Sequence, residues 1–324
     1  VLTPLRILHP PVAKVKSKPA KLPSMEADVA VLFDAELKKI KGSGAQIKHC
    51  IGTLKDPQRR DVFRKLAAMD RLAELLGPDA IELFIPYLNH EYFRLRERSL
   101  QLAANAIKTG GAELLIQEFY PKDYPDKAIG ILAAFALSGD NKGVALANKA
   151  LATEHEELRY QALHTLTDIH KMKAVDLIIA HLKSAEHPLD QIGCEEALSK
   201  LAADPKNTTA IRDRMIKELP KFGIPGKGGA YMVLAKISDK TCLDLLEKSN
   251  STDSKAEFNL LAKALSYSPS RRADQIMLKF ARGDKKSAEA VGNHATRRLV
   301  LGPKGFGDLT DKEGMDCAEP MIKM

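Results

Sequence analysis

The feature that most constrains the fold is an amphipathic segment that returns about every thirty-odd residues. Its clearest copy, residues 155–166, reads HEELRYQALHTL, and its apolar side chains fall on one stripe of an α-helix. With Leu163 as the reference, the matching positions are Ala67, Leu100, Ala133, Leu198 and Ala235, at spacings of 33, 33, 30, 35 and 37 residues. A two-helix unit of this length cannot close a core alone. The period therefore predicts stacked helix pairs, an α-solenoid.

Turn signals divide the chain into these pairs. Asp56-Pro57 is typical of a helix start, and Gly77-Pro78, Gly110-Gly111 and Gly139-Asp140 separate the two helices of three units. The predicted pairs are 57–76 with 78–88, 90–108 with 111–120, 126–138 with 141–152, 155–170 with 172–184, 188–203 with 207–220, 229–238 with 239–248, and 254–267 with 270–282, followed by a last helix over 284–300. Aromatic residues make up only 5% of the chain and Trp is absent, which favours helices packed through Ala and Leu.

Two segments resemble the first helices of HEAT repeats, in the armadillo-like superfamily: LRERSLQLAANAI at 95–107 and LRYQALHTLTDI at 158–169. The resemblance implies an all-α protein, a right-handed α-solenoid of about seven HEAT-like helix pairs over residues 56–300. In that family the arginine after the leucine often ties adjacent repeats together. By resemblance, Arg96 and Arg159 take that role, whereas Gly193 and Cys194 replace the Leu-Arg pair in the fifth unit.

The ends of the chain differ from this repeating part. Residues 1–24 contain five prolines and five basic residues but no acidic residue, so we expect an extended arm. It is either a solvated leader or an arm that lies on a partner protein or another copy. The residues predicted to bind the partner are Leu2, Leu5, Arg6, Ile7, Leu8, Lys14, Lys16, Lys18 and Lys21. Residues 25–55 are predicted as a lead helix and a linker, and residues 301–324 as an irregular tail.

The net charge of +8 is uneven, since residues 1–55 hold ten Lys and Arg against four Asp and Glu. The sequence contains no apolar run long enough to cross a bilayer. If Val1 is a processed terminus, we expect export to the periplasm or a compartment lumen, and otherwise a cytoplasmic protein. The four cysteines, separated and without a CxxC motif, indicate neither a metal site nor a disulfide framework.

Two His-Glu pairs are the candidates for metal chemistry, His90-Glu91 and His155-Glu156. Deoxyhypusine hydroxylases, a HEAT-like family, bind two irons through four such pairs on successive repeats, and this chain has two. Glutamate at a helix start is also favoured by the helix dipole. The glycine-rich segment 223–229 lacks the Ser or Thr that a phosphate-binding loop places after its lysine, so we interpret it as a turn. No metal or other cofactor is expected.

Basic clusters such as Arg212/Arg214 and Arg271/Arg272 alternate with acidic residues. They indicate a surface that binds nucleic acid or another polyanion only if they lie on one face of the protein. No motif names a reaction, and we expect the chain not to be an enzyme. The favoured hypothesis is a non-catalytic scaffold or assembly subunit that binds partner proteins, or copies of itself, through its helical surface and its arm. The alternatives are a nucleic-acid or polyanion-binding HEAT-like protein and a metal-dependent or lyase-like HEAT-repeat enzyme.

Overall fold

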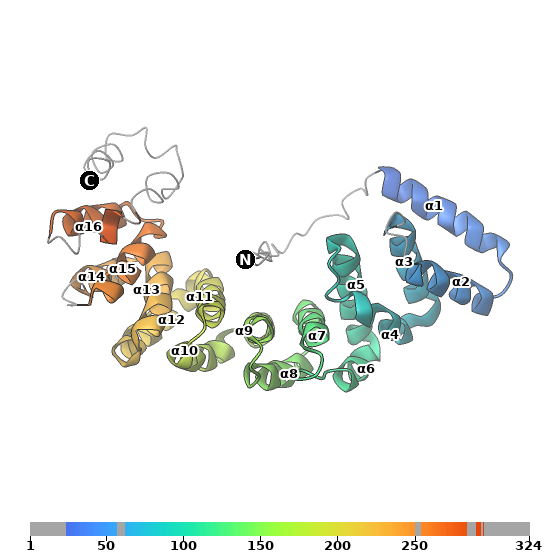
Figure 1. Cartoon of the computed structure of the whole chain (residues 1–324), viewed down its shortest axis with the longest axis horizontal. Coiled ribbons are helices and arrows are strands. Elements are labelled where there is room, and N and C mark those ends of the chain that lie inside the picture. Colours follow the sequence, from blue (N-terminus) through green and yellow to red (C-terminus); the bar gives the residue numbers. More distant parts are fainter. Residues whose placement is uncertain (1–23, 57–61, 250–253, 284–289, 293, 295–324) are drawn as a thin grey trace. The chain divides into compact units, whose positions relative to one another are not determined.

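The computed structural model describes residues 24–56, 62–249, 254–283, 290–292 and 294. These residues are helices and connecting turns without a strand, which confirms the all-α class for the described part of the chain. The helices fall into two units, divided between Ala80 and Ile81. Figure 1 colours the helices of both units along the chain.

The first unit holds α1 (Ser24–Lys39), α2 (Ser43–Lys55), α3 (Val62–Leu76) and the 3₁₀ turn η2 (Gly77–Ala80). Both α1 and α2 pack against α3. In α1, Phe33 and Leu37 are buried, whereas Leu32 is 64% exposed. The structure has a helix, α2, where the sequence analysis expected a linker. Its apolar residues Ile47, Cys50, Ile51 and Leu54 follow helical spacing, and Cys50 and Leu54 are buried.

The second unit contains a series of helices that pack each against the next: α5 against α7, α7 against α9, α9 against α11, α11 against α13, and α13 against α15. Their bounds are α5 Phe93–Ala106, α7 Pro125–Ser138, α9 Glu156–His170, α11 Pro188–Ala202, α13 Ile224–Ile237 and α15 Lys255–Ser266. Proline stands at the first position of α7 and α11, where its missing N–H leaves no helical bond unmade.

A second series alternates with the first along the chain. It comprises α4 (Ile81–Phe84), α6 (Ala112–Gln117), α8 (Lys142–Leu151), α10 (Val175–Ser184), α12 (Pro205–Glu218), α14 (Lys240–Lys248) and α16 (Arg271–Ala281). Four short segments join helices of the two series: the 3₁₀ segments η3 (Ile85–Tyr87), η5 (Lys171–Ala174) and η6 (Leu219–Lys221), and the π-helical segment η4 (Ile107–Gly111). Most buried apolar side chains of this unit form one core that extends from Ile81 to Val291.

Helix α13 differs from the sequence prediction, which placed a turn over residues 223–229 and began the helix at Gly229. The helix begins at Ile224 and includes three of these glycines. A methyl group on Gly226 would lie 2.9 Å from the carbonyl oxygen of Leu182, and one on Gly229 would lie 2.8 Å from Leu182 Cδ1. Glycine therefore stands in this helix because α13 approaches α10 closely, and not because the chain turns there.

Candidate functional site

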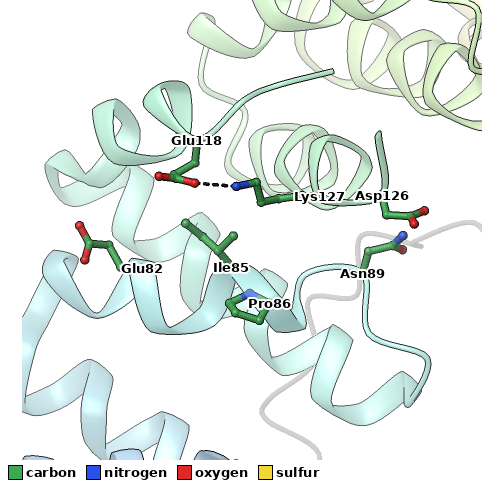
Figure 2. A pocket seen from close by; sticks show the side chains of 7 residues that line it. All are labelled: Glu82, Ile85, Pro86, Asn89, Glu118, Asp126 and Lys127. Carbon is green, nitrogen blue, oxygen red and sulfur yellow. Dashed lines mark hydrogen bonds and ion pairs between the residues drawn. The ribbon is translucent and has the colours of Figure 1, made fainter. Parts of the chain in front are cut away.

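A half-open pocket lies in the second unit where α4, α6 and α7 end or begin, and Figure 2 shows its lining side chains. Its volume is about 610 Å³. Three carboxylates, one ammonium, one amide and two apolar side chains line it: Glu82, Glu118, Asp126, Lys127, Asn89, Ile85 and Pro86. Three acidic groups against one basic group give the pocket a negative balance.

The side of the pocket formed by α7 is fixed by a close helix contact. Gly130 lies where α7 crosses the residues after η3, and a methyl group at this position would be 2.5 Å from Leu88 Cβ and 2.9 Å from Leu88 C. Leu88 itself is buried. Only glycine allows this approach, which places Asn89 opposite Asp126 in Figure 2.

Lys127 occupies one edge of the pocket. Its Nζ donates to Glu118 Oε2 at 2.6 Å, and it lies 5.1 Å from the ring centre of Tyr124 and 5.7 Å from that of Tyr120. An ammonium over aromatic rings is attracted by their negative faces. This edge of the pocket therefore combines a carboxylate and two rings around a lysine ammonium.

The other two carboxylates are differently placed. Glu82 and Asp126 are exposed, and neither forms an ion pair with any residue that the structure describes. Asp126 lies in the first turn of α7, where the helix dipole favours a negative charge. The pocket thus presents two uncompensated negative charges to solvent.

Four exposed aromatic side chains stand at the start of α5 or just before α7, two helices that pack against each other, and we call them the aromatic rim. Tyr92 and Phe93 follow Asn89 at the start of α5 and are 48% and 57% exposed. Tyr120 and Tyr124 precede α7 and are 48% and 59% exposed. Exposed aromatic residues gathered in one region are typical of surfaces that bind other proteins.

A buried ion pair joins two successive helices of the first series. Arg159 of α9 donates from Nη2 to Asp190 Oδ2 of α11 at 2.7 Å, and from Nη1 to the carbonyl oxygen of Thr153 at 2.8 Å. His181 Nε2 of α10 lies 3.4 Å from Asp190 Oδ1. Burial by itself would raise the pKa of Asp190, but the hydrogen bonds and charge of Arg159, with a further contribution from His181, outweigh burial and lower it.

Arg96, the other arginine given an inter-repeat role by resemblance, has local partners. Its guanidinium donates to the carbonyl oxygen of His90 at 2.7 Å and lies 5.7 Å from the ring centre of Phe93. His90 belongs to the turn before α5, and Phe93 is the first residue of α5. Arg159 and Arg96 hold equivalent positions in the repeat. The Arg159 side chain joins two successive helix pairs, whereas the Arg96 side chain contacts residues at the start of its own helix.

Two further carboxylates, Glu196 and Glu257, link neighbouring helices. Tyr160 of α9 donates to Glu196 Oε2 of α11 at 2.6 Å, and His164 Nε2 lies 3.3 Å from the same oxygen. Burial, and then the bond to Glu196, raise the pKa of Tyr160. In α13, Tyr231 and Lys227 donate to Glu257 Oε1 of α15 at 2.6 and 2.9 Å. Lys227, from the glycine-rich segment, therefore has a carboxylate partner.

The His-Glu candidates for metal binding are not brought together with further ligands. His90 accepts a hydrogen bond at Nδ1 from the backbone N–H of Tyr92, and its ring stacks on Tyr87. His155 Nδ1 lies 3.2 Å from Glu157 Oε2, and Glu156 Oε2 lies 3.6 Å from His187 Nδ1. Within the described residues, including Glu91, no group of three or more His, Cys, Asp or Glu side chains could hold a metal ion.

Several arginines of the predicted basic clusters are neutralised by acidic residues. Arg212 pairs with Asp213 and Asp239, each at 2.8 Å, and Arg214 lies 3.5 Å from Asp176. Arg272 contacts Asp244 and Glu247. Such pairing reduces the positive potential that a surface needs to bind a polyanion. The predicted partner-binding residues of the arm, Leu2, Leu5, Arg6, Ile7, Leu8, Lys14, Lys16, Lys18 and Lys21, lie outside the described residues.

The pocket residues were not singled out by sequence reasoning. Glu82, Glu118 and Lys127 look like ordinary surface charges when they are read along the chain. One local signal was present in YPKDYPDK at 120–127, where two tyrosines, a proline turn and a lysine stand close together.

In the described residues, no helix has the length and apolar character needed to cross a membrane.

No family model matches the chain, and no curated protein matches its sequence. Among solved structures, the chain is similar to human deoxyhypusine hydroxylase in complex with glycerol. The two share 12% sequence identity with a TM-score of 0.31, over 79% of this chain and 96% of that one. Values this low carry no argument about the activity of this chain.

The matched structure is that of an enzyme, which runs against the expectation that this chain is not an enzyme, and we withdraw that expectation without assigning an activity to the chain. That expectation rested on the lack of a recognisable reaction motif, which excludes only the reactions that such motifs mark. A non-catalytic role is therefore not carried further.

Proposed function

We propose that this protein is an assembly subunit that binds partner proteins, or copies of itself, through a helical-repeat surface and an extended N-terminal arm. In this proposal the helix pairs form a right-handed α-solenoid of about seven HEAT-like units. The succession of contacts from α5 to α15, with the second-series helices packed beside them, supports stacked pairs of this kind.

The observation that carries the proposal is the aromatic rim beside a negatively charged pocket. Large aromatic side chains lose contact with water when they are covered by a partner, and they contribute much of the binding energy at protein interfaces. The rim supplies four of them at the starts of α5 and α7. Arm and helical surface together would give two linked contacts, so that the overall affinity exceeds that of either alone.

The test is removal of the arm. We expect deletion of residues 1–24 to abolish assembly in sedimentation velocity while the far-UV circular dichroism and the melting transition stay unchanged. A control chain carries a Gly/Ser arm of equal length, which keeps the chain length but removes the basic and apolar side chains. Assembly that persists in both variants would show that the proposed function is wrong.

A further inference from the structure

The aromatic rim and the pocket are matched in chemistry to one segment of this chain, its N-terminal arm. The arm has Arg6 and four lysines and no acidic residue, and its first eight residues, VLTPLRIL, are mostly apolar. The pocket offers two carboxylates without an ion pair in the described part of the chain, and the rim offers exposed apolar surface. We infer that the pocket and the rim receive the arm of another copy of this chain, an inference that rests on the proposed function.

Lys127 shows how the site holds a lysine side chain. Its ammonium lies 2.6 Å from a carboxylate oxygen of Glu118 and within 6 Å of two tyrosine ring centres. An incoming lysine meets carboxylates at Asp126 and Glu82, which carry no ion pair in the described structure. The attraction between an ammonium and a carboxylate is strengthened where the pocket wall excludes water from one side.

The arm also fits the rim through its expected extended backbone and through the spacing of its lysines. Five prolines favour an extended chain, which loses little conformational freedom when it is bound. Aromatic-lined surfaces commonly bind extended proline-containing segments because proline rings and aliphatic side chains pack flat on aromatic rings. Tyr92, Phe93, Tyr120 and Tyr124 provide such rings, and the lysines at 14, 16 and 18 provide charges at every second residue.

The decisive experiment exchanges charges in the full chain. Glu82→Lys with Asp126→Lys reverses the charge of the pocket, and because both positions are exposed we expect the chain to fold despite the loss of the favourable charge in the first turn of α7. We expect the concentration for half-assembly to rise by about tenfold or more, as for charge reversal at other interfaces. The matched control is Glu154→Lys with Glu186→Lys, which changes the net charge equally at exposed carboxylates that form no ion pair in the described structure. The control should assemble within about twofold of the original chain.

Mixing then distinguishes another copy from the chain's own arm. A second variant carries Lys14→Glu, Lys16→Glu and Lys18→Glu. Each reversed chain should assemble poorly alone, and an equimolar mixture should assemble because the reversed arm of one fits the reversed pocket of the other. Failure of the mixture to assemble contradicts binding of another copy's arm in this pocket.

A variant that leaves the pocket charges intact provides a second test. Tyr120→Ala with Tyr124→Ala removes half of the rim at exposed positions, and it should weaken assembly about tenfold while the melting temperature stays unchanged. If assembly depends on the arm but neither the charge nor the aromatic variant affects it, the proposed function stands and the docking site is wrong. If assembly does not depend on the arm, the proposed function itself is wrong, and the docking site is wrong with it.

Discussion

The guanidinium of Arg159 in α9 forms a two-pronged ion pair with the carboxylate of Asp190 in α11. Nε lies 2.9 Å from Oδ1 and Nη2 lies 2.7 Å from Oδ2, and the two side chains are 9% and 5% exposed. The third nitrogen donates to the carbonyl oxygen of Thr153, which follows α8. One side chain therefore ties together the end of one helix pair, the start of the next and the start of the one after.

Removing the arginine alone should be costly. Arg159→Met leaves the Asp190 carboxylate buried without its guanidinium partner and with only the contact to His181, and we expect a loss of about 3–5 kcal/mol in the free energy of unfolding. The double variant Arg159→Met with Asp190→Leu should recover much of this loss, because no buried charge remains. Urea unfolding followed by circular dichroism measures both values.

The matched control for this pair is the exposed contact between Lys200 of α11 and Asp168 of α9, which joins the same two helices. Lys200→Met should cost no more than about 1 kcal/mol, because solvent screens an exposed pair. An equal cost for Arg159→Met and Lys200→Met would contradict the special role of the buried pair.

The same pair predicts how stability depends on pH. The pKa of Asp190 is lowered in the folded protein from its ordinary value of 3.8. The ionised carboxylate therefore contributes its full stability above that ordinary value, and the contribution is lost as the pH falls through the lower folded pKa. Urea midpoints measured from pH 7 downward should fall in acid, and less steeply for Asp190→Asn. Parallel curves for the two proteins would contradict this assignment.

Two glycine-to-alanine substitutions are predicted to change the free energy of unfolding in opposite directions. Gly130→Ala places a methyl group 2.5 Å from Leu88 Cβ and 2.9 Å from the Leu88 backbone, so α7 must move away from the pocket. We expect a loss of about 1–3 kcal/mol. Gly52→Ala in α2 has no neighbour within 4 Å and should stabilise its helix by up to about 1 kcal/mol. Thermal unfolding of both variants checks the signs, and stabilisation by Gly130→Ala would contradict the close contact.

The sequence alone predicted the helical class and most helix bounds, because the period and the Gly and Pro turns are local signals. Thus 155–170 was expected and α9 covers Glu156–His170. The start of α13 was missed because glycine signals a turn locally, and only the nearby Leu182 shows that it permits close packing. The pocket was beyond sequence reasoning, since Glu82, Glu118 and Asp126 come together only through packing of helices.

Cys194 provides the last prediction. In the fifth unit it stands at the register position that Arg159 holds in the fourth, and its thiol is fully buried in α11. Burial raises the pKa of Cys194, and burial together with Asp239 raises that of Cys242 to about 12. Because the thiolate is the reactive form, both cysteines, and the buried Cys50, should resist thiol reagents in the folded protein.

Labelling with a chromogenic disulfide reagent at pH 8 measures this resistance. A Cys317→Ser variant removes the fourth cysteine, so that every reacting thiol belongs to the described residues. In urea all three should react, and without urea the reaction should be at least about 100-fold slower, limited by opening of the helices around each thiol. Fast labelling of one native thiol, identified by peptide mapping, would show that the helix holding it opens readily, contrary to a continuous core through that helix.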